Sequence, residues 1–134
     1  MRRRSARGVR ELGLALVAGP ALLASGALGR PAAAHALVLE SRPAVDAVLP
    51  GPDLAIELRF NSRIDAQRSK LSLFTEDGQE CASCRIELAS GGGDGTLAGR
   101  ASGLAPGRYR LRWQVLALDG HITRGDIPFL VRAP

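Results

Sequence analysis

The chain carries several short runs in which apolar and polar residues alternate, and this two-residue period is typical of β-strands with one buried face. The clearest run is residues 109–115, in which Tyr, Leu, Trp and Val alternate with Arg and Gln. Residues 54–60 keep their large apolar side chains in the same phase, and residues 70–74 repeat the pattern before the turn-forming pair Asp77-Gly78. The segments predicted as strands are 36–41, 54–60, 70–74, 85–88, 96–100, 109–115 and 127–131.

Glycine and proline separate these segments, most clearly in residues 90–95 and 105–107. No helical period is sustained over three turns, and residues 63–70 hold one helical turn at most. Pro128 indicates that the last strand is an edge strand or contains a bulge, because proline cannot donate a hydrogen bond to a sheet. About seven short strands with this punctuation predict an all-β protein, a Greek-key β-sandwich or barrel.

The first 34 residues have the order of a secretory signal peptide. Five arginines lie within the first ten residues, an apolar stretch follows over residues 12–29, and alanines close it at residues 32–34. A membrane anchor is the alternative, but a glycine–proline pair interrupts the stretch and its length is marginal for a span. We therefore expect residues 1–34 to be a cleaved signal peptide and residues 35–134 to form one exported domain.

The cleavage site decides which residue begins the mature chain. Cleavage after Ala34 leaves His35 first. Ala34-His35-Ala36 is also an Ala-x-Ala pattern, and cleavage after Ala36 leaves Leu37 first. The chemistry of the N-terminus therefore depends on which of the two bonds is cut.

The leader also accounts for the basic charge of the chain. It holds six of the 18 Lys and Arg residues and one of the 13 Asp and Glu residues, so the domain keeps 12 basic and 12 acidic side chains. A domain without a basic excess lacks the charge that neutralises phosphates, so we do not expect nucleic-acid binding.

The only two histidines stand where a metal ion could use them, His35 at the expected mature N-terminus and His121 in Asp119-Gly120-His121. As the first residue, His35 offers its α-amine and its imidazole, which both lose protons readily to a metal at neutral pH. Asp119 and His121 are two residues apart, so in an extended segment they point to the same side and add one oxygen and one nitrogen. Three nitrogens and a carboxylate suit Cu(II), although Zn(II) can use the same donors. Either histidine can also be incidental, because single motif matches are often false.

Several further segments occur in the order and spacing of one protein family. They are His35-Ala36, Ser41-Arg42-Pro43-Ala44, Leu58-Arg59-Phe60, Leu104 to Tyr109 leading into Trp113, and Leu118-Asp119-Gly120-His121. Over nearly all of residues 35–134 the chain resembles the periplasmic copper-resistance proteins of the CopC type. The resemblance implies a seven-stranded Greek-key β-barrel of immunoglobulin-like shape. It also implies one Cu(II) per chain, held by the N-terminal amine, His35, Asp119 and His121.

The same resemblance implies a role in copper homeostasis or resistance in the periplasm. Such a protein binds, stores or hands on copper, often beside a membrane copper-transport partner of the CopD type. We expect it to be a monomer and not an enzyme. The chain departs from the family in three ways: its one methionine, Met1, leaves with the leader; Asn61, Ser62 and Arg63 stand where some members have an acidic residue; and Ile122 follows the ligand histidine in place of proline.

Cys81 and Cys84 lie outside the resemblance and have two interpretations. In an oxidising compartment two cysteines this close most often form a local disulfide. As free thiols they could instead bind Cu(I), which soft thiolates select. A thioredoxin-like motif is disfavoured because no βαβ pattern surrounds the pair, and a structural zinc site would need a second pair.

Two other functions compete with copper binding by a carrier. An oxidative copper enzyme, such as a polysaccharide monooxygenase, uses the same N-terminal histidine brace but needs a broad, usually aromatic, substrate platform. The single Trp and single Tyr of this chain both fall in the buried phase of one predicted strand, which argues against such a platform. A metal-free immunoglobulin-like accessory module is the other alternative.

Overall fold

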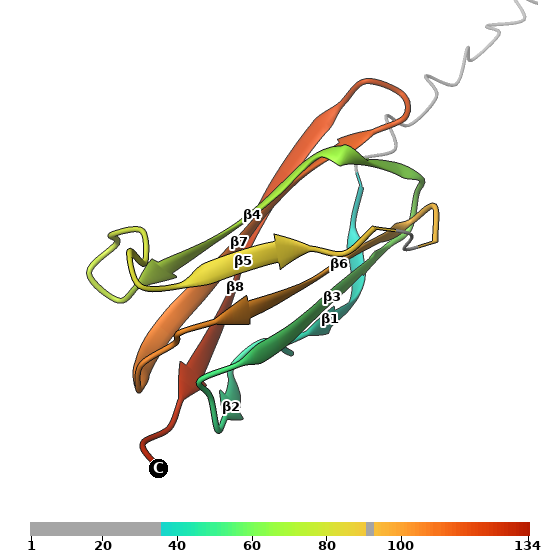
Figure 1. Ribbon diagram of the computed structural model, residues 1–134. Helices are drawn as coiled ribbons and strands as arrows, with labels where there is room; N and C mark the ends of the chain where they lie inside the picture. Colours follow the sequence, from blue (N-terminus) through green and yellow to red (C-terminus); the bar gives the residue numbers. More distant parts are fainter. Residues whose placement is uncertain (1–35, 91–92) are drawn as a thin grey trace, which may run out of the picture. The chain divides into compact units, whose positions relative to one another are not determined.

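The computed structural model describes residues 36–90 and 93–134, which form eight β-strands and no helix (Figure 1). The strands are β1 (Val38–Arg42), β2 (Ala47–Leu49), β3 (Leu54–Phe60), β4 (Ile64–Thr75), β5 (Arg85–Leu88), β6 (Thr96–Ser102), β7 (Gly107–Ala117) and β8 (Ile122–Val131). Each segment predicted as a strand overlaps one of them. Within this part of the chain there is no helix of the length and apolarity that a membrane crossing needs.

The strands form two four-stranded sheets that pack face to face as a sandwich. One sheet has the order β1-β3-β6-β5 and the other the order β2-β8-β7-β4. Neighbouring strands are antiparallel except β2 and β8, which run parallel. The expectation of an all-β protein is confirmed, and of the two forms that the sequence left open, the structure is a sandwich and not a closed barrel.

The structure corrects the sequence prediction at two places. The strand that sequence reasoning missed is β2, whose three residues are too few to show a period and which pairs with residues 129–131. Residues 63–70 do not form a helical turn, because β4 already begins at Ile64. The pairing of β4 with β7 is, however, interrupted by a bulge between Asp65 and Lys70. Within this bulge Asp65 accepts hydrogen bonds from Gln67 N, Arg68 N and the Ser69 hydroxyl, so local contacts replace the ladder.

Alternating side chains of both sheets form the core. The alternation predicted for residues 54–60 and 109–115 is observed, with every second residue buried. Phe60 at the end of β3 packs edge-on against Trp113 of β7, with the ring centroids 5.2 Å apart. The expectation drawn from Pro128 is wrong as stated, because β8 lies between β2 and β7 and its register with β7 contains no bulge. Pro128 directly precedes the residues of β8 that pair with β2.

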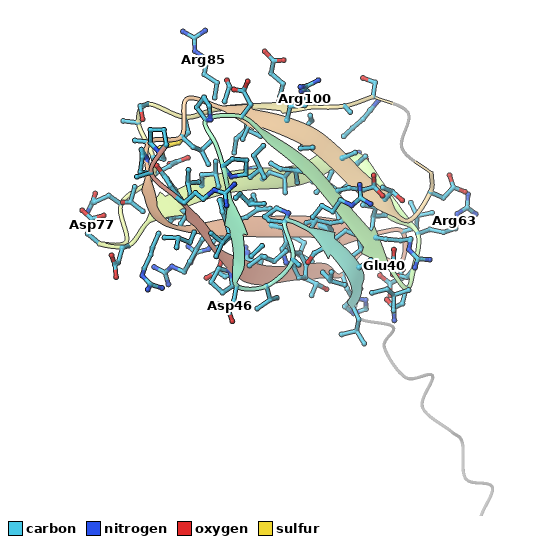
Figure 2. All side chains as sticks on the ribbon, turned by 90° about the horizontal axis from the view of Figure 1, so that it is seen from below. Glu40, Asp46, Arg63, Asp77, Arg85 and Arg100 are labelled. Carbon is cyan, nitrogen blue, oxygen red and sulfur yellow. A yellow bond between two sulfur atoms is a disulfide. The ribbon has the colours of Figure 1, made fainter. Side chains whose placement is uncertain are left out.

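The two ends of the sandwich carry different loops. At one end the turn between β3 and β4 meets the first described residues, since Asn61 N donates to Leu37 O over 3.0 Å, and meets the end of β7, since Leu118 N donates to Arg63 O over 3.3 Å. The loop between β4 and β5 lies at the opposite end (Figure 1). Figure 2 shows the same separation through Arg63 and Asp77, whose side chains project from opposite ends.

Candidate metal centre

Asp119 and His121 lie in the tight turn that joins β7 to β8. Ala117 N donates to His121 O and Gly120 N donates to Ala117 O, both over 2.9 Å, so the turn is closed by backbone hydrogen bonds. Gly120 has a φ of 89°, a left-handed conformation that glycine adopts without strain. The turn, and not an extended segment as the sequence suggested, therefore brings the carboxylate and the imidazole together.

The carboxylate of Asp119 contacts His121 twice. Its Oδ1 accepts from the backbone N–H of His121 at 3.0 Å, and its Oδ2 lies 3.1 Å from the ring Nδ1 of His121. The backbone hydrogen bond from His121, followed by the bond from its ring, lowers the pKa of Asp119 below the usual value of an aspartate. Both side chains stay accessible, with 40% of Asp119 and 53% of His121 exposed. The turn thus presents an ionised carboxylate and an imidazole to solvent.

The N-terminal part of the domain is attached at this same end. Ala36 is fully buried in the core, so the backbone directly after His35 is anchored. Leu37 N donates to Asn61 Oδ1 over 2.8 Å, and Leu37 O accepts from Asn61 N. Because Leu118 N also bonds to this β3–β4 turn, the first described residues and the start of the β7–β8 turn are tied to a common segment.

The structure brings together two of the three predicted metal ligands, Asp119 and His121. His35 and the whole predicted leader lie outside the described residues. Among residues 36–90 and 93–134, no group of three His, Cys, Asp or Glu side chains could hold a metal ion. The sequence did not predict a role for Asn61, which was noted only as standing where some family members have an acidic residue. An asparagine at the end of an alternating run is a turn signal, but its partner cannot be known without the strand register.

Cys81 and Cys84 form a disulfide in the loop between β4 and β5. Both residues are half-buried against the core, and Cys81 N donates to Leu73 O over 2.8 Å. A disulfide has no thiolate to offer to Cu(I), so in this state the pair is not a thiol site. The loop lies at the end of the sandwich opposite to Asp119 and His121 (Figure 1).

The two aromatic residues that could have formed a substrate platform are inside the protein. Tyr109 and Trp113 are both buried, and the Tyr109 hydroxyl donates to Ala105 O over 2.7 Å. Neither ring is therefore available to stack on a substrate at the surface.

The comparisons with known proteins identify the family. The model of the CopC domain matches residues 38–132. This chain belongs to the CopC family. The CopC fold accordingly recurs in solved structures: CopC from Methylosinus trichosporium OB3b is 23% identical with a TM-score of 0.64, covering 73% of this chain and 94% of that one. PcoC, a methionine-rich copper resistance protein from Escherichia coli, is 22% identical with a TM-score of 0.60, covering 74% and 100%.

Two curated relatives are also similar to this chain at low identity. The copper transport protein CutJ of Bacillus subtilis is 22% identical over 98 residues, which are 73% of this chain but only 18% of CutJ. Protein YobA of Escherichia coli is 25% identical over 99 residues, 74% of this chain and 80% of YobA. The region that matches this chain is thus most of YobA but less than a fifth of CutJ.

Proposed function

We propose that this protein binds one Cu(II) ion in the periplasm after its leader is cleaved between Ala34 and His35. The observation that carries the proposal is the Asp119–His121 pair, which is exposed at the end of the sandwich where the N-terminal segment is anchored. Membership of the CopC family, whose relatives include a copper transport protein and a copper resistance protein by name, favours copper as the metal.

The donor set fits Cu(II) chemically. His35 supplies its α-amine and its imidazole, and the β7–β8 turn supplies His121 and Asp119. Nitrogen and carboxylate donors suit the tetragonal sites of Cu(II), which also has the highest affinity among the divalent first-row metals. Zn(II) could use the same groups, so it is the competing metal for this site.

Asp119 has two ways to serve this site. It can donate a carboxylate oxygen to the metal, or it can keep its contact with His121 Nδ1 and orient the ring so that Nε2 faces the metal. The 3.1 Å contact between Oδ2 and Nδ1 is the geometry that the orienting role needs, and such contacts are common beside metal-bound histidines, whereas the direct role needs Oδ2 to turn to the metal. Asp119→Asn separates the two, because the amide oxygen still accepts a hydrogen bond from Nδ1–H but is a weaker ligand than a carboxylate.

The function that follows is to bind, store or hand on copper rather than to catalyse a reaction. The burial of Tyr109 and Trp113 supports this choice over an oxidative enzyme that needs an aromatic platform. In CutJ the matching region is 18% of a longer copper transport protein. We therefore propose that this domain works with a membrane copper-transport protein of the CopD type.

The decisive experiment compares chains with different first residues. A chain beginning at His35 and a chain beginning at Ala34 differ by one alanine, but in the longer one the α-nitrogen of His35 is an amide. Cu(II) binding is followed by quenching of the single tryptophan, Trp113. We expect the chain beginning at Ala34 to bind more than about tenfold more weakly, and His121→Ala in the shorter chain to lose at least about 100-fold. Equal binding by all three chains contradicts the site.

A further inference from the structure

The β3–β4 turn makes an unusual contact with the start of the domain. In a regular antiparallel pair, two residues exchange backbone N–H and C=O groups. Here Asn61 N donates to Leu37 O over 3.0 Å, but Leu37 N donates to the side-chain Oδ1 of Asn61 over 2.8 Å. The last pair of the β1–β3 ladder is Val38 with Phe60. At the next pair, Leu37 with Asn61, the side-chain oxygen of Asn61 takes the place of its backbone oxygen as the acceptor. The backbone of Asn61 is thereby free to leave the sheet and turn toward β4.

The turn that carries Asn61 is itself held on two other sides. Phe60 N donates to Gly95 O over 2.8 Å and Ile64 N donates to Asp94 O over 2.7 Å, which fixes both ends of the turn to the segment before β6. In addition, Arg63 O accepts from Leu118 N, the residue directly before Asp119. A turn bonded to three neighbours moves little, so whatever it holds is held at a defined place.

We propose that Asn61 is a positioning residue for copper, because it fixes the backbone at Leu37, two residues after the expected mature N-terminus, to the turn that also holds Leu118 before Asp119 and His121. The inference rests on the proposed function and adds to it the residue that joins the two halves of the site. Chain termini are poorly ordered unless they are tied down, and ordering a residue at the moment of binding costs free energy. Asn61 and the buried Ala36 order the backbone beside His35 before any metal arrives, so the chelate binds with less loss of entropy.

The chemistry of the contact allows a sharp test. Asn61 acts through an acceptor oxygen, so Asn61→Ala removes the hydrogen bond from Leu37 N while the backbone bond to Leu37 O can persist. Asn61→Asp keeps an acceptor at the same place. It also adds a negative charge near the expected metal, which does not weaken binding of a cation. The pair of variants therefore separates the hydrogen bond from the mere presence of asparagine.

The experiment uses three mature chains that begin at His35: wild type, Asn61→Ala and Asn61→Asp. Amide hydrogen exchange of Leu37 is measured by NMR on the metal-free proteins, and Cu(II) affinity by quenching of Trp113. We expect Asn61→Ala to speed the exchange of Leu37 at least about tenfold and to weaken Cu(II) binding about 3- to 10-fold, the effect of one hydrogen bond. Asn61→Asp should restore both values to the wild-type level or beyond.

Arg63→Gln is the matched control in the same turn. It removes the exposed ion pair between Arg63 and Asp94, with its N–O distance of 2.9 Å, but leaves every backbone bond of the turn in place. An exposed pair of this kind contributes little to stability. We therefore expect Arg63→Gln to leave the exchange of Leu37 unchanged and, because it also removes a positive charge from the turn, not to weaken Cu(II) binding.

Each contrary result has its own meaning. If wild type binds Cu(II) and Asn61→Ala binds it equally well, Asn61 does not position the site, and only this inference is overturned. Unchanged exchange of Leu37 in Asn61→Ala shows that the contact itself does not order the N-terminus, and this result also overturns the role of Asn61 alone. If wild type does not bind Cu(II), the proposed function is wrong and the role of Asn61 is lost with it.

Discussion

Replacing Gly125 by alanine tests the packing of the core at one point. Gly125 of β8 stands opposite Trp113 of β7 in the sheet register, and the indole ring covers it. A Cβ added at Gly125 would lie 2.5 Å from Cζ2, 2.6 Å from Cε2 and 2.8 Å from Nε1 of Trp113. Such distances are far inside a carbon–carbon contact of 3.5–4.0 Å. The ring has to move for the alanine to fit.

The ring has little room to move, because Trp113 is buried and also packs against Phe60. Forcing an extra carbon into a packed core costs about 1–3 kcal/mol. For a domain of about 100 residues, 1 kcal/mol corresponds to about 4–8 °C in melting temperature, so we expect Gly125→Ala to melt about 5–20 °C lower. The assay is thermal unfolding followed by the fluorescence of Trp113, whose emission also reports the displaced ring.

Gly93→Ala supplies the control for the same chemical change. A Cβ added at Gly93 meets nothing within 4 Å. Alanine there lowers the entropy of the unfolded chain without a clash, so Gly93→Ala should melt at the wild-type temperature or slightly above it. Equal melting temperatures for Gly125→Ala and Gly93→Ala would refute the packing of Trp113 over Gly125.

Three further predictions concern the disulfide, the β7–β8 turn and the core. The double variant Cys81→Ser with Cys84→Ser should destabilise the fold by about 2 kcal/mol in chemical denaturation, which is the chain-entropy value for so short a loop. A copper titration should show unchanged Cu(II) affinity, because the β4–β5 loop lies at the end of the sandwich opposite to the β7–β8 turn (Figure 1). Asp119 should titrate below the usual aspartate pKa in an NMR titration of metal-free protein. The stability that its ionisation contributes is then present above pH about 4 and is lost as pH falls through the lower pKa of the folded state. His121→Gly removes the ring contact but keeps the backbone N–H at residue 121, which is the larger cause, so it should raise the pKa of Asp119 only in part. Leu111→Ala, at a fully buried position, should cost about 3–5 kcal/mol in the same denaturation assay, and a cost below about 1 kcal/mol would contradict its burial.

The alternation of side chains was sufficient to find the long strands, because a half-buried strand must place every second residue in the core. It correctly assigned the inward faces of β3 and β7. It could not reveal β2, whose three residues are stabilised by a parallel partner far along the chain. It also could not exclude a helical turn near Asp65, where side-chain hydrogen bonds to nearby amides decide the conformation.

The candidate site divides in the same way. Asp119 and His121 could be predicted from residue type and spacing, because a carboxylate and an imidazole two residues apart can face one ion. Their actual arrangement depends on the turn at Gly120, which brings the Asp119 carboxylate into contact with the His121 imidazole. This contact helps to lower the pKa of Asp119. The role of His35 as a ligand stays a prediction from the sequence.

The sequence by itself determined the class of fold, the residue types of the candidate ligands and the family, since these depend on periodicity, composition and ordered motifs. Tertiary structure alone decided that the segment following His35 and the turn carrying His121 lie at one end of the sandwich. The physical reason is that their link runs through Asn61 and Arg63, in a turn that is distant in sequence from His121. Contacts of that kind depend on strand register and sheet packing, and no local pattern in the chain records them.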